Sequence, residues 1–366
     1  MRLNKVTPAL TPTGLTKTPR ELGYSMPAEW EKHAATWIAW PHNREDWPGK
    51  FHAIPWVYCD IVRHLSRTEL VHILVNDAES EKRVVNLLRR AGADLNNVRI
   101  HQWRTDRVWL RDSGPLFVRR QGGPTAITNW KFNAWAKYDN WQNDDQIPAH
   151  VAASEELPAW FPMIGEHRVV LEGGSIDVNG TGLMLTTEEC LLSDVQQRNP
   201  GINREQLEQA FRDYLGVEKV LWMNRGIAGD DTHGHIDDAT RFVSADTIVT
   251  VTEQNKLDEN HLPLLENLER LRDARDLNDK PFRIVELPMP SPVVFEGQRL
   301  PASYGNFYIA NGVVLVPTFN DKNDGKALNI LAELFPERDV VGIHCGDFIW
   351  GLGALHCMTQ QQPATE

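Results

Sequence analysis

The sequence predicts an α/β protein with one large domain. Short β-rich segments alternate with amphipathic helical segments, and no low-complexity linker or shift in composition divides residues 25–366. Residues 1–24 are rich in Thr, Pro and Lys without apolar periodicity, so we expect a flexible leader there. A chain of 366 residues that is 41% hydrophobic can bury a substantial core without disulfide or metal staples.

The individual elements follow from periodicity and from capping residues. A helix is expected over residues 78–92, closed by Gly92, and another over residues 203–216, with Asn203 as its N-cap and Gly216 just past its end. Two more helices are expected over residues 260–275 and 324–335. The predicted strands cover residues 69–75, 169–178, 182–187, 219–223, 240–252, 282–287, 312–317 and 340–345.

The charge balance narrows the function classes. A formal net charge of −12 argues against a nucleic-acid or anionic-membrane surface and is compatible with a cationic ligand. The first residues carry no apolar stretch typical of a signal peptide, and no apolar run approaches the roughly 18 residues that a membrane span needs. The four cysteines, which form no Cys-x-x-Cys pair, indicate a reducing compartment rather than a disulfide framework, and we expect a cytoplasmic protein.

Four potentially reactive residues recur at similar intervals along the chain. Asp112 and Glu172 are 60 residues apart, Glu172 and His235 are 63 apart, and His235 and Cys357 are 122 apart, about twice the same step. A structural repeat of that length in a radial arrangement would bring these side chains together at its centre.

The segment 104–115 places Trp109, Arg111 and Asp112 before a Ser-Gly-Pro turn. An aromatic side chain beside a carboxylate suits a planar organic cation. The same pattern also fits an Arg111–Asp112 ion pair beside a core tryptophan.

Glu172 interrupts an apolar run just before two glycines. An acid within a buried strand needs a hydrogen-bond or charge partner. Glu172 is therefore either an edge-strand residue at a turn or an acid that supports a catalytic histidine.

The segment 229–238 contains a His-x-His-x-Asp pattern. On an extended strand His233 and His235 would point to the same side, which suggests a metal site, and Asp237 would share that face. Asp238 stands where the similar motif of the metallo-β-lactamase hydrolases has its last histidine, so a His235–Asp237 pair for acid/base chemistry and cation recognition fits better.

Cys357 follows a Gly-x-Gly segment near the C-terminus, where a backbone can approach a ligand closely. A single cysteine is usually a buried inert thiol, but with a histidine elsewhere in the chain it is a candidate nucleophile. Cys59 and Cys345 lack such a loop, and we interpret them as core positions.

Taken together, these stretches resemble the agmatine deiminases of the guanidine-modifying (pentein) superfamily, and they are similar to the bacterial peptidylarginine deiminases of the same branch. The resemblance extends over nearly the whole chain after the leader. The matching segments, in chain order, are residues 26–49, 109–115, 132–141, 171–175, 231–237 and 356–363.

The resemblance implies a five-bladed, pseudo-symmetric α/β propeller of ββαβ units. It implies hydrolysis of agmatine, a cationic small molecule, to N-carbamoylputrescine and ammonia through a covalent amidino-cysteine intermediate, with no metal or organic cofactor. It is also compatible with a homodimer. By motif, Cys357 is the nucleophile and His235 the general acid/base. Glu172 supports that histidine, Asp112 and Asp237 grip the guanidinium, and Trp109 lines the pocket.

The chemistry of these residue types agrees with those roles. Two carboxylates can orient a guanidinium in a dry pocket while a thiolate attacks its carbon. Because carboxylates near Cys357 should raise the pKa of its thiol, we predict that the bound cation helps to deprotonate the nucleophile.

The sequence departs from the family pattern at four positions. Leu352 and Ala354 replace a glycine and an asparagine before the nucleophile, and Asp177 and His233 stand where many relatives have His and Asn. These changes leave other substrates open, namely another alkylguanidine or arginine residues in peptides. A metal-dependent hydrolase using His233, His235 and Asp237, or a non-catalytic guanidinium-binding module, is a less favoured alternative.

Overall fold

A computed structural model describes residues 17–365 of the chain. Residues 1–16, where most of the expected leader falls, and residue 366 lie outside the described residues. Residues Arg20–Leu22 form a 3-10 helix, and Tyr24 is buried with its ring 5.4 Å from that of Trp160.

Five small sheets repeat one strand pattern. Each sheet contains an antiparallel pair of strands. A further strand, separated along the chain from that pair by at least one helix, is parallel to the strand of the pair beside which it lies. Four of these sheets have three strands, and the fifth, β20-β1-β2-β3, has four. The mixed α/β class expected from the sequence is confirmed.

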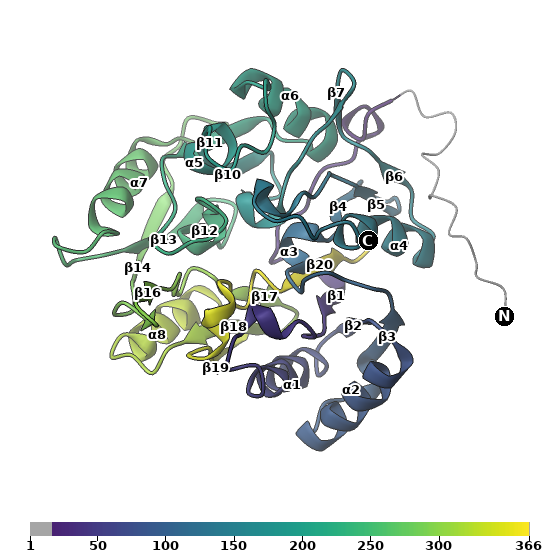
Figure 1. Cartoon of the computed structure of the whole chain (residues 1–366). Helices are drawn as coiled ribbons and strands as arrows, with labels where there is room; N and C mark the ends of the chain where they lie inside the picture. The colour runs from purple at the N-terminus through teal and green to yellow at the C-terminus, as the bar shows by residue number, and fades with distance from the viewer. Residues whose placement is uncertain (1–16, 366) are drawn as a thin grey trace.

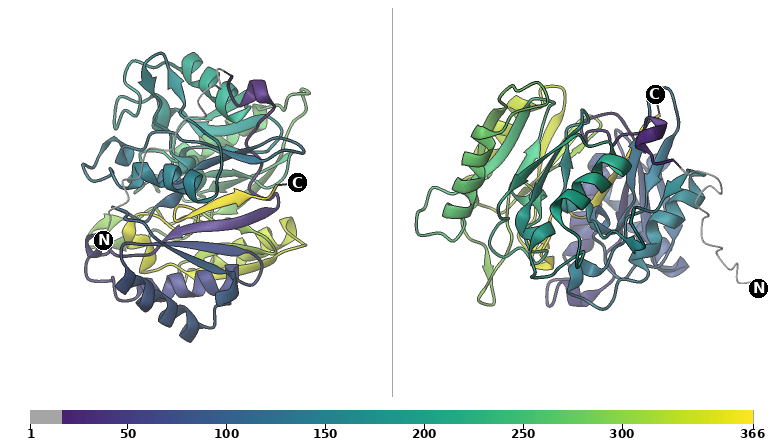
Figure 2. Two further views of the ribbon diagram at one scale, coloured as in Figure 1. Left: turned by 90° about the vertical axis from the view of Figure 1, so that its right-hand side faces the viewer. Right: turned by 90° about the horizontal axis from the view of Figure 1, so that it is seen from above.

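The four-stranded sheet joins the two ends of the described chain, since the C-terminal strand β20 pairs antiparallel with β1 (Figure 2). Its strands are β20 (Thr359–Pro363), β1 (His33–Ala39), β2 (Leu70–Val75) and β3 (Val98–Gln102). The three-stranded sheets, in chain order, are β4 (Leu116–Arg119), β5 (Thr125–Thr128) and β6 (Ala159–Trp160); β9 (Asp177–Val178), β10 (Leu183–Thr187) and β11 (Lys219–Met223); β12 (Thr240–Phe242), β13 (Thr247–Thr252) and β14 (Arg283–Pro288); β17 (Tyr308–Ala310), β18 (Val313–Thr318) and β19 (Asp339–His344).

The longer helices lie on the outside of the molecule and the sheets lie toward its centre (Figure 1). The helices are α1 (Ile54–Leu65), α2 (Ala78–Ala91), α3 (Leu110–Ser113), α4 (Ile147–Ser154), α5 (Glu188–Leu192), α6 (Arg204–Leu215), α7 (His261–Asp273) and α8 (Asp324–Leu334). Two short hairpins complete the chain: β7 (Met163–Ile164) with β8 (His167–Arg168), and β15 (Val294–Phe295) with β16 (Gln298–Arg299). Among residues 17–365, no helix has the length and apolar character needed to cross a membrane.

The capping residues act as predicted. Asn203 and Gln206 form a capping box at the start of α6, and Gly92 and Gly216 end α2 and α6 in the left-handed conformation. The strand predicted over residues 169–178 is wrong in its extent. Only a single bridge at Val170 and the short strand β9 are extended pairs, with a 3-10 helix (Gly173–Ser175) between them.

The hydrophobic core reaches the pocket described next. Its largest cluster contains apolar side chains of α1, β1 and β2, and it continues to Trp109 and Cys357. Cys59 and Cys345 are buried in the same cluster, as expected for core positions.

Candidate active site

A pocket of about 510 Å³ opens beside Trp109, Asp112, Trp135 and Cys357. This volume is within the usual range for small-molecule sites. Trp109 is among the residues that line this cavity, and its expected contact with a substrate stays a prediction. His235, Asp237 and Glu172 lie deeper and are fully buried.

Asp112 is in α3, the short helix that directly follows Trp109. Its Oδ1 accepts a hydrogen bond from the Gly174 backbone N–H at 3.1 Å, and its Oδ2 accepts one from Trp135 Nε1 at 2.9 Å. Burial raises the pKa of Asp112, and the negative charges of Asp237 and Glu172 raise it further. The positive charge of His235 lowers it only in part, so the pKa is about 6. Asp112 is thus poised to change charge near neutral pH.

Arg111 does not pair with Asp112, which was the alternative interpretation of this segment. Its guanidinium lies 3.4 Å from Glu29 Oε2 and donates to Gln361 Oε1 at 2.7 Å. The backbone N–H of Arg111 also donates to the Cys357 carbonyl at 3.1 Å. Arg111 therefore ties the nucleophile segment to α3.

Trp135 is positioned by an unusual turn. Ala134, Trp135 and Ala136 all have positive φ, at 49°, 58° and 53°. Left-handed backbone is unfavourable for residues with a Cβ, and such strain clusters at functional sites. The turn holds the Trp135 indole against Asp112. The sequence pattern gave no indication of this contact.

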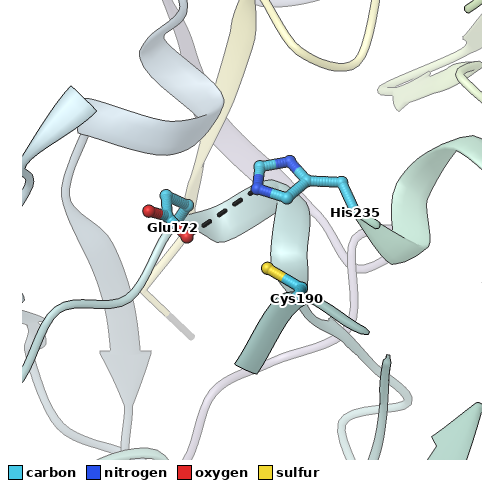
Figure 3. Close-up of side chains that lie close together, drawn as sticks. All are labelled: Glu172, Cys190 and His235. Carbon is cyan, nitrogen blue, oxygen red and sulfur yellow. Dashed lines mark ion pairs between the residues drawn. The ribbon is translucent and has the colours of Figure 1, made fainter. Parts of the chain in front are cut away.

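Glu172 and His235 face each other across 3.7 Å, from Oε2 to Nε2 (Figure 3). Cys190, in the middle of the short helix α5, lies beside them with its sulfur directed toward the pair (Figure 3). Its sulfur, Glu172 and His235 offer donor atoms within 4.8 Å of one another. Glu172 Oε1 accepts from Arg198 Nε at 3.0 Å. The fully buried Glu172 is therefore the acid beside a histidine, not an exposed edge-strand residue.

These neighbours set the charges of the pair. Burial raises the pKa of Glu172, but Arg198 and His235 outweigh it and hold the pKa at about 2. Burial lowers the pKa of His235, but Asp112, Cys190 and Glu172 outweigh it and raise the pKa well above the ordinary value. His235 is therefore an imidazolium at neutral pH, with Nδ1 lying 3.7 Å from Asp112 Oδ1.

Gly174 occupies the point where three of these side chains converge. A Cβ there would lie 2.6 Å from His235 Nδ1, 2.7 Å from Asp112 Oδ1 and 3.1 Å from Asp237 Oδ2. Only glycine leaves these polar atoms in place. Steric crowding thus explains why glycine follows Glu172, since a side chain at Gly174 would displace these polar atoms.

The expected strand through the His-x-His-x-Asp segment is wrong. Residues 229–234 form a loop, and Ile236–Asp238 form a 3-10 helix with His235 as its N-cap. The Asp230 carboxylate accepts from the backbone N–H groups of Gly234 and His235, which turns the chain there. His233, with φ of 63°, is directed to Ser193 Oγ at 3.2 Å and does not join His235.

Cys357 lies beside Asp237 at the pocket floor. Its thiol is 3.8 Å from Asp237 Oδ2, and Asn306 Nδ2 donates to its sulfur at 3.0 Å. Burial raises the pKa of Cys357 well above the ordinary value, and the charges of Asp237, Asp238 and Asp112 raise it further. The thiol is therefore neutral in the empty pocket.

The loop before Cys357 contains two of the departures from the family pattern. Leu352 lines the pocket with φ of 67°, a conformation that favours glycine, and Ala354 is buried. At Gly353, a Cβ would lie 2.8 Å from Trp109 Cζ3 and 3.1 Å from Cys357 Cβ. Gly353 therefore allows the tryptophan and the nucleophile to approach each other.

Two groups of three donors in residues 17–365 could hold a metal ion, and His233 belongs to neither. They are Glu172, Cys190 and His235, and Asp237, Asp238 and Cys357. In the first group Glu172 is paired with Arg198, and in the second Asp237 is paired with His356. The less favoured alternative, a metal site of His233, His235 and Asp237, does not correspond to either group.

The chain matches known proteins along nearly its whole length. The family model for Porphyromonas-type peptidyl-arginine deiminase matches residues 25–363. An agmatine deiminase of Stutzerimonas stutzeri is 35% identical over 375 residues, covering 96% of this chain and 99% of the relative.

Solved structures agree with the sequence relatives. An Enterococcus faecalis agmatine deiminase is 28% identical, with a TM-score of 0.87 over 95% of this chain and 98% of that one. A C. jejuni agmatine deiminase, a cysteine-to-serine variant with substrate bound, is 27% identical, with a TM-score of 0.82 over 93% of this chain and 97% of that one. The chain therefore belongs to the Porphyromonas-type peptidyl-arginine deiminase family, and it is similar to bacterial agmatine deiminases over nearly its whole length.

Proposed function

We propose that this protein hydrolyses the guanidinium group of agmatine to N-carbamoylputrescine and ammonia. The observation that carries the proposal is the placement of two buried carboxylates around the Cys357 thiol. Asp112 lines the pocket together with Cys357, and Asp237 lies directly behind, with its Oδ2 3.8 Å from the Cys357 sulfur. Within the described residues, Asp237 Oδ1 has no hydrogen-bond partner. A guanidinium N–H would satisfy it, and the cation would compensate the carboxylates.

The reaction proceeds in two halves. When the cation binds, the Cys357 thiol releases its proton to water, and the resulting thiolate attacks the central guanidinium carbon to form a tetrahedral intermediate. His235 gives a proton to the departing nitrogen, so that ammonia leaves and an amidino-cysteine remains. Water then attacks the same carbon and gives a proton to His235, the carbon–sulfur bond breaks, and the urea-type product is released with the thiolate regenerated.

His235 acts as both acid and base because of its surroundings. The raised pKa keeps the imidazolium available for the first half-reaction. Glu172, held ionised by Arg198, supports the ring and stabilises its cationic form. Trp109 forms a wall of the pocket beside the guanidinium-binding carboxylates.

The fold supports two further proposals. Because five sheets share one strand pattern, we propose that they are the blades of a pseudo-symmetric α/β propeller. We also propose that residues 25–366 form a single catalytic domain after the leader, with core clusters spread among the sheets.

Other properties extend the proposal. Four free, buried cysteines suit a reducing compartment, and we propose the cytoplasm. The proposed chemistry uses only side chains and water, so no metal or organic cofactor is required. A homodimer stays a prediction.

Arginine residues in peptides are the second candidate substrate class, since the matching family model is named for peptidyl-arginine deiminase. The full-length relatives named for agmatine favour the smaller substrate. A panel of agmatine, free arginine, peptidyl-arginine and methylguanidines, scored by ammonia release, separates the classes. Agmatine should have the highest kcat/KM. A preference for peptidyl-arginine would replace the substrate assignment and leave the reaction type unchanged.

The nucleophile is tested by Cys357→Ser. We expect loss of measurable ammonia release with agmatine binding retained, because the hydroxyl is a much weaker nucleophile at the same position. Cys59→Ser, another buried free cysteine, is the matched control and should keep the turnover of the folded enzyme. Normal turnover by the Cys357 variant would refute the assignment.

A further inference from the structure

Glu29 is a buried carboxylate that accepts hydrogen bonds from residues of different sheets. This carboxylate precedes β1 and is only 7% exposed. Its Oε2 accepts from His356 Nε2 at 2.7 Å and from Arg241 Nη2 at 2.9 Å, and it lies 3.4 Å from Arg111 Nη2. Its Oε1 accepts from the backbone N–H of Ile309 in β17 at 2.8 Å. Glu29 is thus an internal anchor for cationic side chains.

His356 connects this anchor to the guanidinium-binding carboxylate. Its Nδ1 lies 2.7 Å from Asp237 Oδ2, and its Nε2 lies 2.7 Å from Glu29 Oε2. An ionised carboxylate only accepts hydrogen bonds, so each ring nitrogen must carry a proton to bond both partners. The ring is therefore an imidazolium between two carboxylates. It also directly precedes Cys357 in the chain.

The charges around His356 balance without any ligand. Arg241 also pairs with Asp177, and so three cations face three carboxylates in this cluster: Arg111, Arg241, His356, Glu29, Asp177 and Asp237. Burial raises the pKa of Asp237, but the hydrogen bond and charge of His356 outweigh it and lower the pKa overall. Asp237 thus stays ionised in the empty pocket.

The Asp237 carboxylate keeps room for a further donor in this arrangement. Its Oδ2 accepts from His356 and lies 3.8 Å from the Cys357 sulfur, while its Oδ1 lacks a partner among residues 17–365. We propose that His356 is a positioning residue, which as an imidazolium anchored by Glu29 fixes the Asp237 carboxylate beside the Cys357 thiol to receive the guanidinium of the substrate. The proposal rests on the proposed function, since it assigns a role in binding the same substrate group.

The test compares His356→Gln with His33→Gln. His33 is also a buried histidine against a carboxylate, with Nδ1 3.4 Å from Glu69 and Nε2 2.7 Å from the Glu29 carbonyl, and it lies outside the residues that line the pocket. We expect His356→Gln to lower kcat/KM for agmatine about 100-fold, chiefly through KM. The acid limb of its pH profile should move to higher pH, because Asp237 loses the cation that lowers its pKa. His33→Gln should keep the wild-type KM and profile.

A measurement on the unmodified enzyme guards against a variant that does not fold. Neutron diffraction of wild-type crystals near neutral pH should place a deuteron on both ring nitrogens of His356. A bare ring nitrogen would overturn the proposal. So would an active wild-type enzyme whose His356→Gln variant matches His33→Gln in KM and pH profile. Absence of ammonia release by the wild type from every guanidine in the panel would instead refute the proposed function.

Discussion

Asp112 and Asp237 both approach the position that a Cβ of Gly174 would occupy, but only Asp237 is hydrogen-bonded directly to a cationic side chain. Asp237 is bonded to the His356 imidazolium, and its pKa is lowered. Asp112 accepts hydrogen bonds only from neutral N–H donors, those of Trp135 and the Gly174 backbone, and the His235 imidazolium lies farther away, 3.7 Å from its Oδ1. Burial outweighs this cation and raises the pKa of Asp112 to about 6.

Because of this difference, the two carboxylates would contribute differently to the proposed binding of a cation. Asp237 is ionised before the substrate arrives because an internal cation already compensates it. Asp112 completes its ionisation only near neutral pH, and a bound guanidinium would favour its charged form. One carboxylate is thus a fixed anchor, and the other responds to the ligand.

The largest effect is expected from neutralising the anchor. Asp237→Asn removes the charge facing the substrate and leaves His356 without a carboxylate on one side, so kcat/KM should fall about 1,000-fold. Asp112→Asn mimics a protonation state that the wild type already visits, so we expect a fall of about 100-fold. Steady-state ammonia release gives both values, and thermal unfolding should show the greater loss of stability in Asp237→Asn. Equal losses in both measurements would remove the distinction.

The pKa of the Cys357 thiol should also depend on these carboxylates. The buried Cys357 faces several carboxylates, so its pKa is raised in the empty enzyme, and a bound guanidinium should lower it. The alkylation rate followed against pH, with and without a slowly reacting guanidinium compound, measures this shift. Asp237→Asn should lower the thiol pKa of the empty enzyme, because Asp237 is the carboxylate that raises it most. Cys357→Ser provides the background rate.

A thiol pKa already below neutrality in the empty enzyme would contradict this picture. In that case the hydrogen bond from Asn306 to the sulfur would dominate over burial and the carboxylates. Substrate binding would then have no part in activating the nucleophile.

Much of the fold was readable from local signals. The helix ends at Gly92 and Gly216 depend on backbone conformations that glycine adopts easily, and such signals need no tertiary context. The single strand expected over residues 169–178 is wrong because a 3-10 helix at Gly173–Ser175 interrupts the apolar segment. The strand expected at His235 failed because the Asp230 side chain turns the loop, which periodicity does not reveal.

The candidate site was predicted through motifs, and its supporting residues were not. His356 and Glu29 are 327 positions apart in the chain, and Asn306 lies 51 positions before Cys357. Contacts of this kind depend on how the sheets are arranged, and no local pattern encodes them. The roles of Cys357, His235, Glu172, Asp112, Asp237 and Trp109 stay predictions for the experiments above.

A smaller effect is expected at the neutral donor of Asp112. Trp135→Phe removes the N–H that bonds Oδ2, which should raise the pKa of Asp112. Since binding needs the ionised carboxylate, activity is lost as pH falls through that pKa, so the acid limb of kcat/KM should move upward from about 6. We expect about a tenfold loss on the acid limb and less in alkaline solution. Trp130→Phe, which removes a buried indole donor to Thr128 instead, should leave the profile unchanged.

The smallest effect is expected at Leu352, in the loop that lines the pocket together with Asp112. Leu352→Gly relieves a left-handed conformation that costs about 1 kcal/mol, and it removes a partly buried side chain of similar value, so the free energy of unfolding should change little. KM for agmatine should change less than about threefold, because we propose that Asp112 and Asp237, rather than this apolar side chain, hold the guanidinium. Gly353→Ala in the same loop is the contrast, since its Cβ would press on Trp109 and Cys357 and should reduce kcat. If Leu352→Gly instead altered KM as strongly as Asp112→Asn, then loop shape and not the pair of carboxylates would control how tightly the substrate is bound.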